Sequence, residues 1–324
     1  MFTNADFKKR LVFAFLVAIS VVSVTPIQAY VLQGPHVLDL MIENLGKAKS
    51  LFVSHKIIFY RSGFVDDSEQ FFPGSESKPS GAVDTQDGSR RMRNHYAEEM
   101  TEVPETMELE GSLRYVFSQA FRSDARSNDS ERIFIFSDGK TLTLIDGNSV
   151  PRATNRFDLY KDLLFYHSRE ELVERLLQLG VDVSISSLGQ FEGKIAFVIG
   201  AEYPDESVSQ VWIDQDTFLP LRWIIKGVDP AGESGTLEIR YLIWWKTGKI
   251  RYPSRIEFYQ DGNLVRVNQV INFEENATFS EELFDINYLK TVFPRSPSQP
   301  IVPGEPEEPS EVEKTIEEFR RIFE

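Results

Sequence analysis

Cysteine is absent from this chain of 324 residues. Its absence excludes a disulfide, a thiolate metal site and a cysteine nucleophile. The fold must therefore be stabilised by its hydrophobic core alone.

Histidine is scarce, and its distribution gives little support for a metal site. The four histidines lie in unrelated segments, at His36, His55, His95 and His167. His167 with Glu170 and Glu171 is the nearest approach to a ligand cluster, and a structural or solvated helix face is the favoured interpretation. Asp84 with Asp87-Gly88 lacks the alternating ligands and terminal Glu of a calcium loop. Asp214 and Asp216 are expected to form a turn, so we predict no metal site.

Catalytic motifs are also lacking. The sequence contains no GxSxG elbow, no HExxH, no Walker loop and no GxGxxG. The sequence pattern identifies no candidate nucleophile and no general acid/base pair. We therefore predict that the protein is not an enzyme, with no catalytic residue and no cofactor.

No apolar run is long enough to cross a bilayer. The longest, Leu11 to Val24, falls short of the roughly 20 residues that a spanning helix needs. It follows Lys8, Lys9 and Arg10 and precedes a cleavage site after Ala29, the pattern of a secretory signal. We predict a signal peptide over 1–29 and a mature protein that is soluble and periplasmic; retention as an anchor is the alternative.

Positive charge is in deficit. The chain has 35 Lys and Arg against 50 Asp and Glu, a net charge of −15. Such a chain generally repels nucleic acid and anionic membrane surfaces. A neutral, apolar or basic partner fits better, and no nucleic acid partner is predicted.

Alternating apolar residues dominate the rest of the sequence. In the stretch from Gln210 to Phe273, one face of a strand carries Leu237, Ile239, Tyr241, Ile243 and Trp245. Asp261-Gly262 is the signal of a tight hairpin, and Asp138-Gly139 is another, between strands over 132–137 and 140–145. Successive strands are therefore expected to be antiparallel neighbours.

The remaining elements are predicted in chain order. We expect a helix over 36–48, a strand over 51–59, a polar excursion over 62–110, one strand face carrying residues 113–121, helices within 158–179, and strands over 181–187 and 194–201. Pro- and Glu-rich residues 294–309 read as a linker. Ser310 and Glu313 form a capping box for an amphipathic helix over 310–324.

Aromatic residues are abundant: 25 Phe, 11 Tyr and 4 Trp. An antiparallel sheet covered by few helices leaves part of its apolar face as a concave surface, which can bury an acyl chain. A filled core is the alternative interpretation. The predicted cavity residues are Phe117, Phe121, Phe134, Phe136, Phe197, Trp223, Tyr241, Trp245 and Phe258.

Several short motifs carry a resemblance to a known family. They are Trp212-Ile213-Asp214, Thr217-Phe218-Leu219-Pro220-Leu221, Tyr252-Pro253-Ser254-Arg255-Ile256, Phe279-Ser280-Glu281-Glu282-Leu283-Phe284, and Gly111 to Arg122 followed by Phe136-Ser137-Asp138-Gly139-Lys140 and Leu144-Ile145-Asp146. Through them, residues 34–293 resemble the outer-membrane lipoprotein carrier family, the LolA-like periplasmic lipoprotein-sorting proteins. The polar excursion and the tail after Pro294 depart from that family's compact pattern.

The resemblance implies a fold and a role. The fold is mainly β with helices, a curved open antiparallel half-barrel covered by helices, over 30–293. Arg122 matches the family's strand arginine, whose guanidinium holds a lid shut through hydrogen bonds to lid backbone carbonyls. An ordinary solvent-facing strand arginine is the alternative.

Two functions are predicted. In the first, a monomeric periplasmic carrier binds acyl chains of lipoproteins, or lipid, and moves them from an inner-membrane transporter to an outer-membrane acceptor. In the second, a sensor or adaptor of the same fold binds a protein partner, for which the helix over 310–324 is suited. The same helix could instead plug the protein's own cavity. Deletion of residues 310–324 separates these two roles of the helix: increased uptake of an acyl probe favours a plug, loss of a protein partner favours an adaptor, and no effect in either assay removes the helix from both schemes.

Overall fold

The computed structural model describes residues 31–60, 106–128, 130–150, 155–228 and 234–293. The chain divides into two compact units, residues 1–32 and 33–324. All helices and strands discussed below belong to the second unit. In the described ranges, every helix is too short or too polar to span a membrane.

The second unit is built on one antiparallel sheet of 13 strands. In spatial order the strands are β6 (Asn148–Val150), β5 (Lys140–Ile145), β4 (Glu131–Ser137), β3 (Ala120–Arg126), β2 (Thr106–Val116), β1 (Ser50–Tyr60), β13 (Asn263–Glu275), β12 (Ile250–Gln260), β11 (Ser234–Thr247), β10 (Pro220–Val228), β9 (Gln210–Asp214), β8 (Lys194–Ile199) and β7 (Ser186–Phe191). The sheet is open, because its edge strands β6 and β7 do not pair with each other.

Tight turns set the antiparallel order, as the sequence predicts. Asp138-Gly139 joins β4 to β5 and Asp261-Gly262 joins β12 to β13. Asp138 and Asp261 have φ angles of 48° and 51°, and the glycines that follow have 71° and 84°. Asp and Gly tolerate this left-handed conformation, so both hairpin predictions are confirmed.

Three strand predictions need correction. β2 begins at Thr106, inside the stretch expected to be a polar excursion. Residues 113–121 do not form one strand, because the chain reverses at Ser118, which has a φ of 59°, and continues as β3. The strand expected over 181–187 begins only at Ser186. The turn at Ser118 has no Asp-Gly or Asn-Gly signal. The period-two pattern of apolar residues therefore predicts one continuous strand across this turn.

The alternation expected for β11 also fails at one end. Ile243 has a φ of 52° and is 64% exposed, and Trp245 is 42% exposed. β10 pairs with β11 only as far as Arg240, so no described strand pairs with this end of β11 on that side. The buried face of β11 therefore stops at Tyr241.

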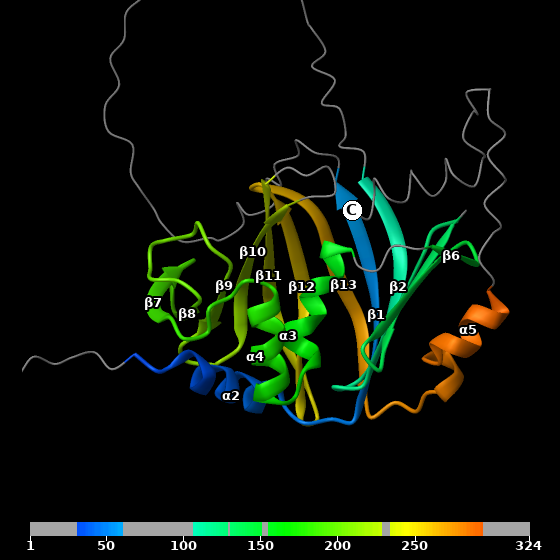
Figure 1. Ribbon diagram of the computed structural model, residues 1–324, viewed down its shortest axis with the longest axis horizontal. Helices are drawn as coiled ribbons and strands as arrows, with labels where there is room; N and C mark the ends of the chain where they lie inside the picture. Colours follow the sequence, from blue (N-terminus) through cyan, green and yellow to red (C-terminus); the bar gives the residue numbers. More distant parts are fainter. Residues whose placement is uncertain (1–30, 61–105, 129, 151–154, 229–233, 294–324) are drawn as a thin grey trace, which may run out of the picture. The chain divides into compact units, whose positions relative to one another are not determined.

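The helices cover the two faces of the sheet unequally. α2 (Gly34–Leu45), η2 (Arg156–Lys161), α3 (Asp162–Phe165) and α4 (Arg169–Gln178) lie on the face that we call the inner face. Figure 1 shows α2, α3 and α4 together in front of the curved strands, with α5 (Ile286–Val292) apart from them. The predicted fold class, an open antiparallel half-barrel covered by helices, is confirmed.

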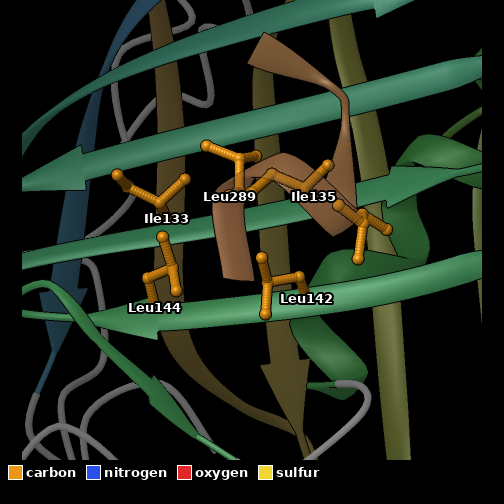
Figure 2. Close-up of a cluster of buried hydrophobic side chains, with 6 residues drawn as sticks. Ile133, Ile135, Leu142, Leu144 and Leu289 are labelled. Carbon is orange, nitrogen blue, oxygen red and sulfur yellow. The ribbon is translucent and has the colours of Figure 1, made fainter. Parts of the chain in front are cut away.

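α5 and the short η3 (Glu281–Leu283) pack on the outer face instead. Leu289 of α5 lies in a buried cluster with strand residues of β4 and β5 (Figure 2). Ile286 of α5 also belongs to this cluster, and Phe293 packs against it. The strand members are Ile133, Ile135, Leu142 and Leu144. This aliphatic cluster anchors the C-terminal part of the described chain.

Replacing Leu289 by alanine is expected to loosen α5 without unfolding the sheet. Truncating a buried leucine costs about 2–5 kcal/mol, and α5 makes few other buried contacts. Hydrogen exchange of the α5 amides should accelerate while exchange in β1 and β12 stays unchanged. Tyr288→Ala, which alters a 45% exposed side chain on the same helix, is the control. Global destabilisation by Leu289→Ala would contradict local anchoring.

Candidate binding site under the covering segment

Buried aromatic side chains line the middle of the inner face. Tyr115 contacts Phe121 edge-on, with ring centroids 4.9 Å apart, and Phe121 lies 6.2 Å from Phe134. The hydroxyls of Tyr115 and Tyr252 share a hydrogen bond of 2.9 Å. These rings come from different strands and form a continuous apolar floor.

A short segment covers this floor. We call residues 156–165, which comprise η2 and α3, the covering segment. The rings of Phe157 and Tyr160 contact the ring of Phe258 edge-to-face, with centroid distances of 5.7 and 5.6 Å. The rings of Phe165 and Phe136 form a third such contact, with centroids 5.7 Å apart. The other apolar members, Leu159, Leu163 and Leu164, are buried as well. The floor is thus occupied by the protein's own side chains.

Polar contacts fix the covering segment in place. Arg132 of β4 donates two hydrogen bonds to the Asp158 carboxylate, at 3.2 and 2.7 Å. The Tyr241 hydroxyl donates to the Tyr160 carbonyl at 2.9 Å. Both contacts are buried, and each ties the segment to a different part of the sheet.

A second set of charges ties the segment to α4. Asp162, which is 1% exposed, accepts from Lys161 Nζ and from Arg175 Nε, both at 2.7 Å. The Lys161 ammonium also lies over the rings of Phe121 and Phe134, at 5.6 and 5.7 Å. A cation placed over aromatic faces is attracted by their quadrupoles. The covering segment is therefore a charged element packed on an aromatic floor.

Polar groups of the sheet also lie under this cover without partners. Both ring nitrogens of His55 and the Nδ2 of Asn268 are buried and make no hydrogen bond within the described part of the chain, and the same holds for the hydroxyl of Tyr160 on the covering segment itself. A Cβ on Gly111, opposite His55 in the neighbouring strand, would overlap the imidazole. Glycine at that position therefore makes room for the histidine. Buried unpaired polar atoms are uncommon in native structures and call for an explanation.

Burial changes the protonation of this group. Desolvation, followed by the charge of Arg266, lowers the pKa of His55 to about 3. Desolvation likewise lowers the pKa of Arg266 to about 10 and raises the pKa of Tyr160. At neutral pH the site holds a neutral imidazole beside a charged guanidinium.

The structure brings most of the predicted cavity residues to the inner face. Phe121, Phe134 and Phe258 lie on the floor, Tyr241 holds the cover, and Phe136 contacts Phe165. Trp223 and Phe197 are buried farther along, on β10 and β8. Phe117 lies at the β2–β3 turn and stacks on His167 at 3.9 Å. Trp245 lies apart and exposed.

Arg122 lies on the outer face. Its Nη1 donates to the Leu283 carbonyl of η3 at 3.1 Å, and its Nε donates to Asp124 at 2.9 Å. The guanidinium thus binds a backbone carbonyl, as the latch prediction supposes, but that carbonyl belongs to the C-terminal segment and not to the covering segment. A latch role for Arg122 stays a prediction.

Sequence reasoning missed the buried charges of the site. Arg132, Asp158, Lys161, Asp162 and Arg266 carry no motif, and in sequence they resemble surface charges. The one available signal was the placement of Asp158, Lys161 and Asp162 among closely spaced apolar residues. A charged residue among apolar residues either faces solvent or is buried with a charged partner, and the sequence pattern alone does not distinguish these two cases.

The acidic and histidine clusters behave as ordinary polar groups. Asp214 accepts from the backbone N–H groups of Asp216 and Thr217, which confirms its predicted turn role. Glu171 accepts from Ser118, and Glu170 pairs with Arg169. Within the described ranges, no group of three or more His, Cys, Asp or Glu is arranged to hold a metal ion.

Several predictions lie outside the described residues. These are the signal peptide over 1–29, the acidic loop with Asp84 and Asp87, the linker over 294–309, and the helix over 310–324 on which the adaptor hypothesis depends.

Comparisons with known proteins give structural similarity only. No family model matches the sequence, and no curated protein matches it either. An outer membrane lipoprotein-sorting protein domain from Vibrio parahaemolyticus is 11% identical over 79% of this chain and 98% of its own, with a TM-score of 0.43. A LolA superfamily protein from Nitrosomonas europaea is 9% identical over 79% and 99%, with a TM-score of 0.44.

A third solved structure, a DUF1329 family protein from Desulfovibrio piger, is 12% identical over 79% of this chain and 97% of its own, with a TM-score of 0.43. These structures include members of the superfamily that the sequence motifs resemble. With TM-scores below 0.5, the similarity assigns neither a family nor a function to this chain.

Proposed function

We propose that this protein binds an acyl chain on its aromatic floor, in the space filled by the covering segment, and that the segment moves aside to admit it. The observation that carries the proposal is the way the segment is held. It is short, and it is fixed by a buried ion pair and a hydroxyl–carbonyl hydrogen bond over an apolar floor. In the absence of ligand, the covering segment fills the space that the acyl chain would take.

The energetics suit exchange between cover and ligand. Burying an acyl chain contributes about 0.8 kcal/mol per methylene. Displacement breaks the hydrogen bond from Tyr241 to Tyr160, which is worth about 1 kcal/mol. It also separates the buried Arg132–Asp158 pair, whose loss costs about 3–5 kcal/mol, and the side chains of the displaced segment lose part of their burial. A ligand with a long chain can offset these losses, whereas a short one cannot. Uptake is then selective for long chains. Release of the ligand is favoured because the covering segment regains these contacts when it returns to the floor.

The cellular role follows from the signal-like start of the sequence. An exported protein that binds acyl chains reversibly is suited to carry a lipid-modified protein, or a lipid, across the periplasm. In this scheme an inner-membrane transporter supplies the cargo and an outer-membrane acceptor receives it. The carrier works as a monomer, without a cofactor.

The movement of the covering segment can be tested with a single cysteine, because the chain has none of its own. Leu164, which is 4% exposed on α3, is replaced by cysteine, and its labelling by a thiol reagent is followed. A saturating long-chain acyl ligand should accelerate labelling by about tenfold or more, since it favours the displaced state.

Two further cysteine variants serve as controls. Leu177→Cys, at a 54% exposed position of α4, should be labelled at the same rate with and without ligand. Val198→Cys, buried in β8 away from the cover, should stay protected in both cases. If saturable binding occurs while Leu164→Cys stays protected, the ligand binds elsewhere and the displacement scheme is wrong.

A further inference from the structure

A band of polar groups crosses the inner face of the sheet. Register pairing places Arg132, Ala125, Gly111 and His55 at one level on four adjacent strands. Asn268 and Arg266 follow on β13, the strand next to β1. The apolar floor with Tyr115 and Phe121 lies on one side of the band. A second apolar cluster, with Ile57, Phe59 and Leu109, lies on the other.

Arg266 is the charged member of this band that lacks an ion-pair partner in the described part of the chain. It is 3% exposed, and its one side-chain hydrogen bond to the described residues runs from Nε to Asn268 Oδ1 at 2.8 Å. Its guanidinium lies over Phe258, Phe59 and Phe157, at 4.9, 5.5 and 5.8 Å. No carboxylate in the described part of the chain forms an ion pair with it. A buried arginine normally has such a partner, because burying an unpaired charge is costly.

The neighbouring charges leave an excess of positive charge. The inner face and the covering segment bury three cations, Arg132, Lys161 and Arg266, and two carboxylates, Asp158 and Asp162. Arg132 and Lys161 each have a carboxylate partner. The surplus cation is therefore Arg266, in a chain whose overall net charge is −15.

We propose that Arg266 binds the anionic head group of the ligand, a carboxylate or a phosphate, while the hydrocarbon chain lies on the aromatic floor. This assignment rests on the proposed acyl-binding function and specifies its ligand class. The Nδ2 of Asn268, whose Oδ1 accepts from Arg266, and the His55 ring, which the charge of Arg266 influences, have no hydrogen-bond partner in the described part of the chain and are available for further polar contacts to the head group. A neutral acyl chain leaves the guanidinium unpaired.

Displacement of a common fluorescent acyl probe from the purified protein tests this assignment. The competitors are hexadecanoate, phosphatidylglycerol and the uncharged hexadecanol. A charge-assisted hydrogen bond favours the anion, so the acid or the phospholipid should bind about tenfold or more tightly than the alcohol. Comparison of the two anions shows whether a free fatty acid or a phospholipid headgroup is preferred.

Two variants remove the surplus charge in different ways. Arg266→Met removes the cation and keeps an apolar stem. Asn268→Asp keeps the cation and gives it the carboxylate that it lacks, in nearly the same shape. Both should reduce the preference for anion over alcohol to about twofold or less, within the range expected when the charged contact is lost. Because Asn268→Asp pairs the buried charge, its thermal unfolding should show an intact fold.

Arg255→Met on the outer face of β12, where Arg255 pairs with Glu257, is the control and should keep the preference. Equal affinity of the wild-type protein for acid and alcohol overturns the head-group assignment alone. The absence of saturable binding for all three competitors overturns the acyl-binding function as well. An unchanged preference in Asn268→Asp also overturns the assignment, since that variant neutralises Arg266.

Discussion

Replacing Asp158 by alanine is expected to lower the free energy of unfolding by about 3–5 kcal/mol. Asp158 is 3% exposed and accepts two hydrogen bonds from Arg132, which is 6% exposed. Its removal takes away the carboxylate that accepts both of these hydrogen bonds, while Arg266 stays nearby as a like charge. The buried guanidinium then loses the partner that offsets its desolvation.

Urea unfolding of the wild-type protein and three variants measures this cost. Arg132→Met with Asp158→Leu removes both charges and should recover most of the lost stability, because an apolar pair of similar volume is often as stable as a buried ion pair. Asp39→Ala breaks an exposed pair with Arg169 and should change the free energy of unfolding far less than Asp158→Ala does, because solvent screens exposed charges. A loss below about 1 kcal/mol for Asp158→Ala would mean that water reaches Arg132 and that the cover is already loose.

The strands were largely predictable because their signals are local. Alternation along β11 up to Tyr241, and the Asp-Gly pairs at the ends of β4 and β12, depend on residues adjacent in sequence. The reversal at Ser118 was not predictable from the same rules. A serine there adopts a positive φ angle, and its N–H donates to the distant Phe165 carbonyl. Tertiary contact, more than turn chemistry, stabilises that hairpin.

The sequence predicted that the floor of the site is aromatic and apolar. It did not predict that the covering segment packs on this floor. Aromatic residues at alternating positions indicate which side of a strand is apolar, and Phe121, Phe134 and Phe258 are buried together with their neighbours. Whether that side faces a ligand or another segment depends on where residues 156–165 pack. Their helical period predicts a helix but not its docking position.

The charges within the site were hidden for a related reason. Asp158 and Arg132 are 26 residues apart, and nothing in either neighbourhood identifies the other as its partner. Arg266 alternates with apolar residues on β13, a position that sequence reasoning assigns to a solvent-facing side chain. It is buried because strands β1 and β12 and the covering segment surround it with rings. Which charges pair is therefore decided by the packing of strands and covering segment in the folded protein, and not by the residues adjacent in sequence.

Acidification from pH 7 to pH 5 is expected to destabilise the protein by about 2 kcal/mol through His55 alone. The pKa of His55 falls from 6.5 to about 3 because burial disfavours the charged imidazole. Between these values the unfolded chain binds a proton that the folded chain does not bind. The free energy of unfolding therefore decreases as the pH falls below about 6.5, and His55 has no effect on it above that value. His167, whose pKa burial lowers to about 4, acts in the same direction.

Urea unfolding at pH 7 and at pH 5 gives the loss of stability for wild type and for His55→Leu. Leucine keeps an apolar side chain in the space beside Gly111 and removes the titrating group. The variant should lose about 2 kcal/mol less than wild type over this interval, whatever its stability at pH 7. A variant in which His167 is replaced by leucine should show a separate reduction, since the two rings lie in different places. Equal losses in wild type and His55→Leu would show that the imidazole gains a proton inside the fold. In that case the polar band is open to water, and Arg266 is solvated when no ligand is bound.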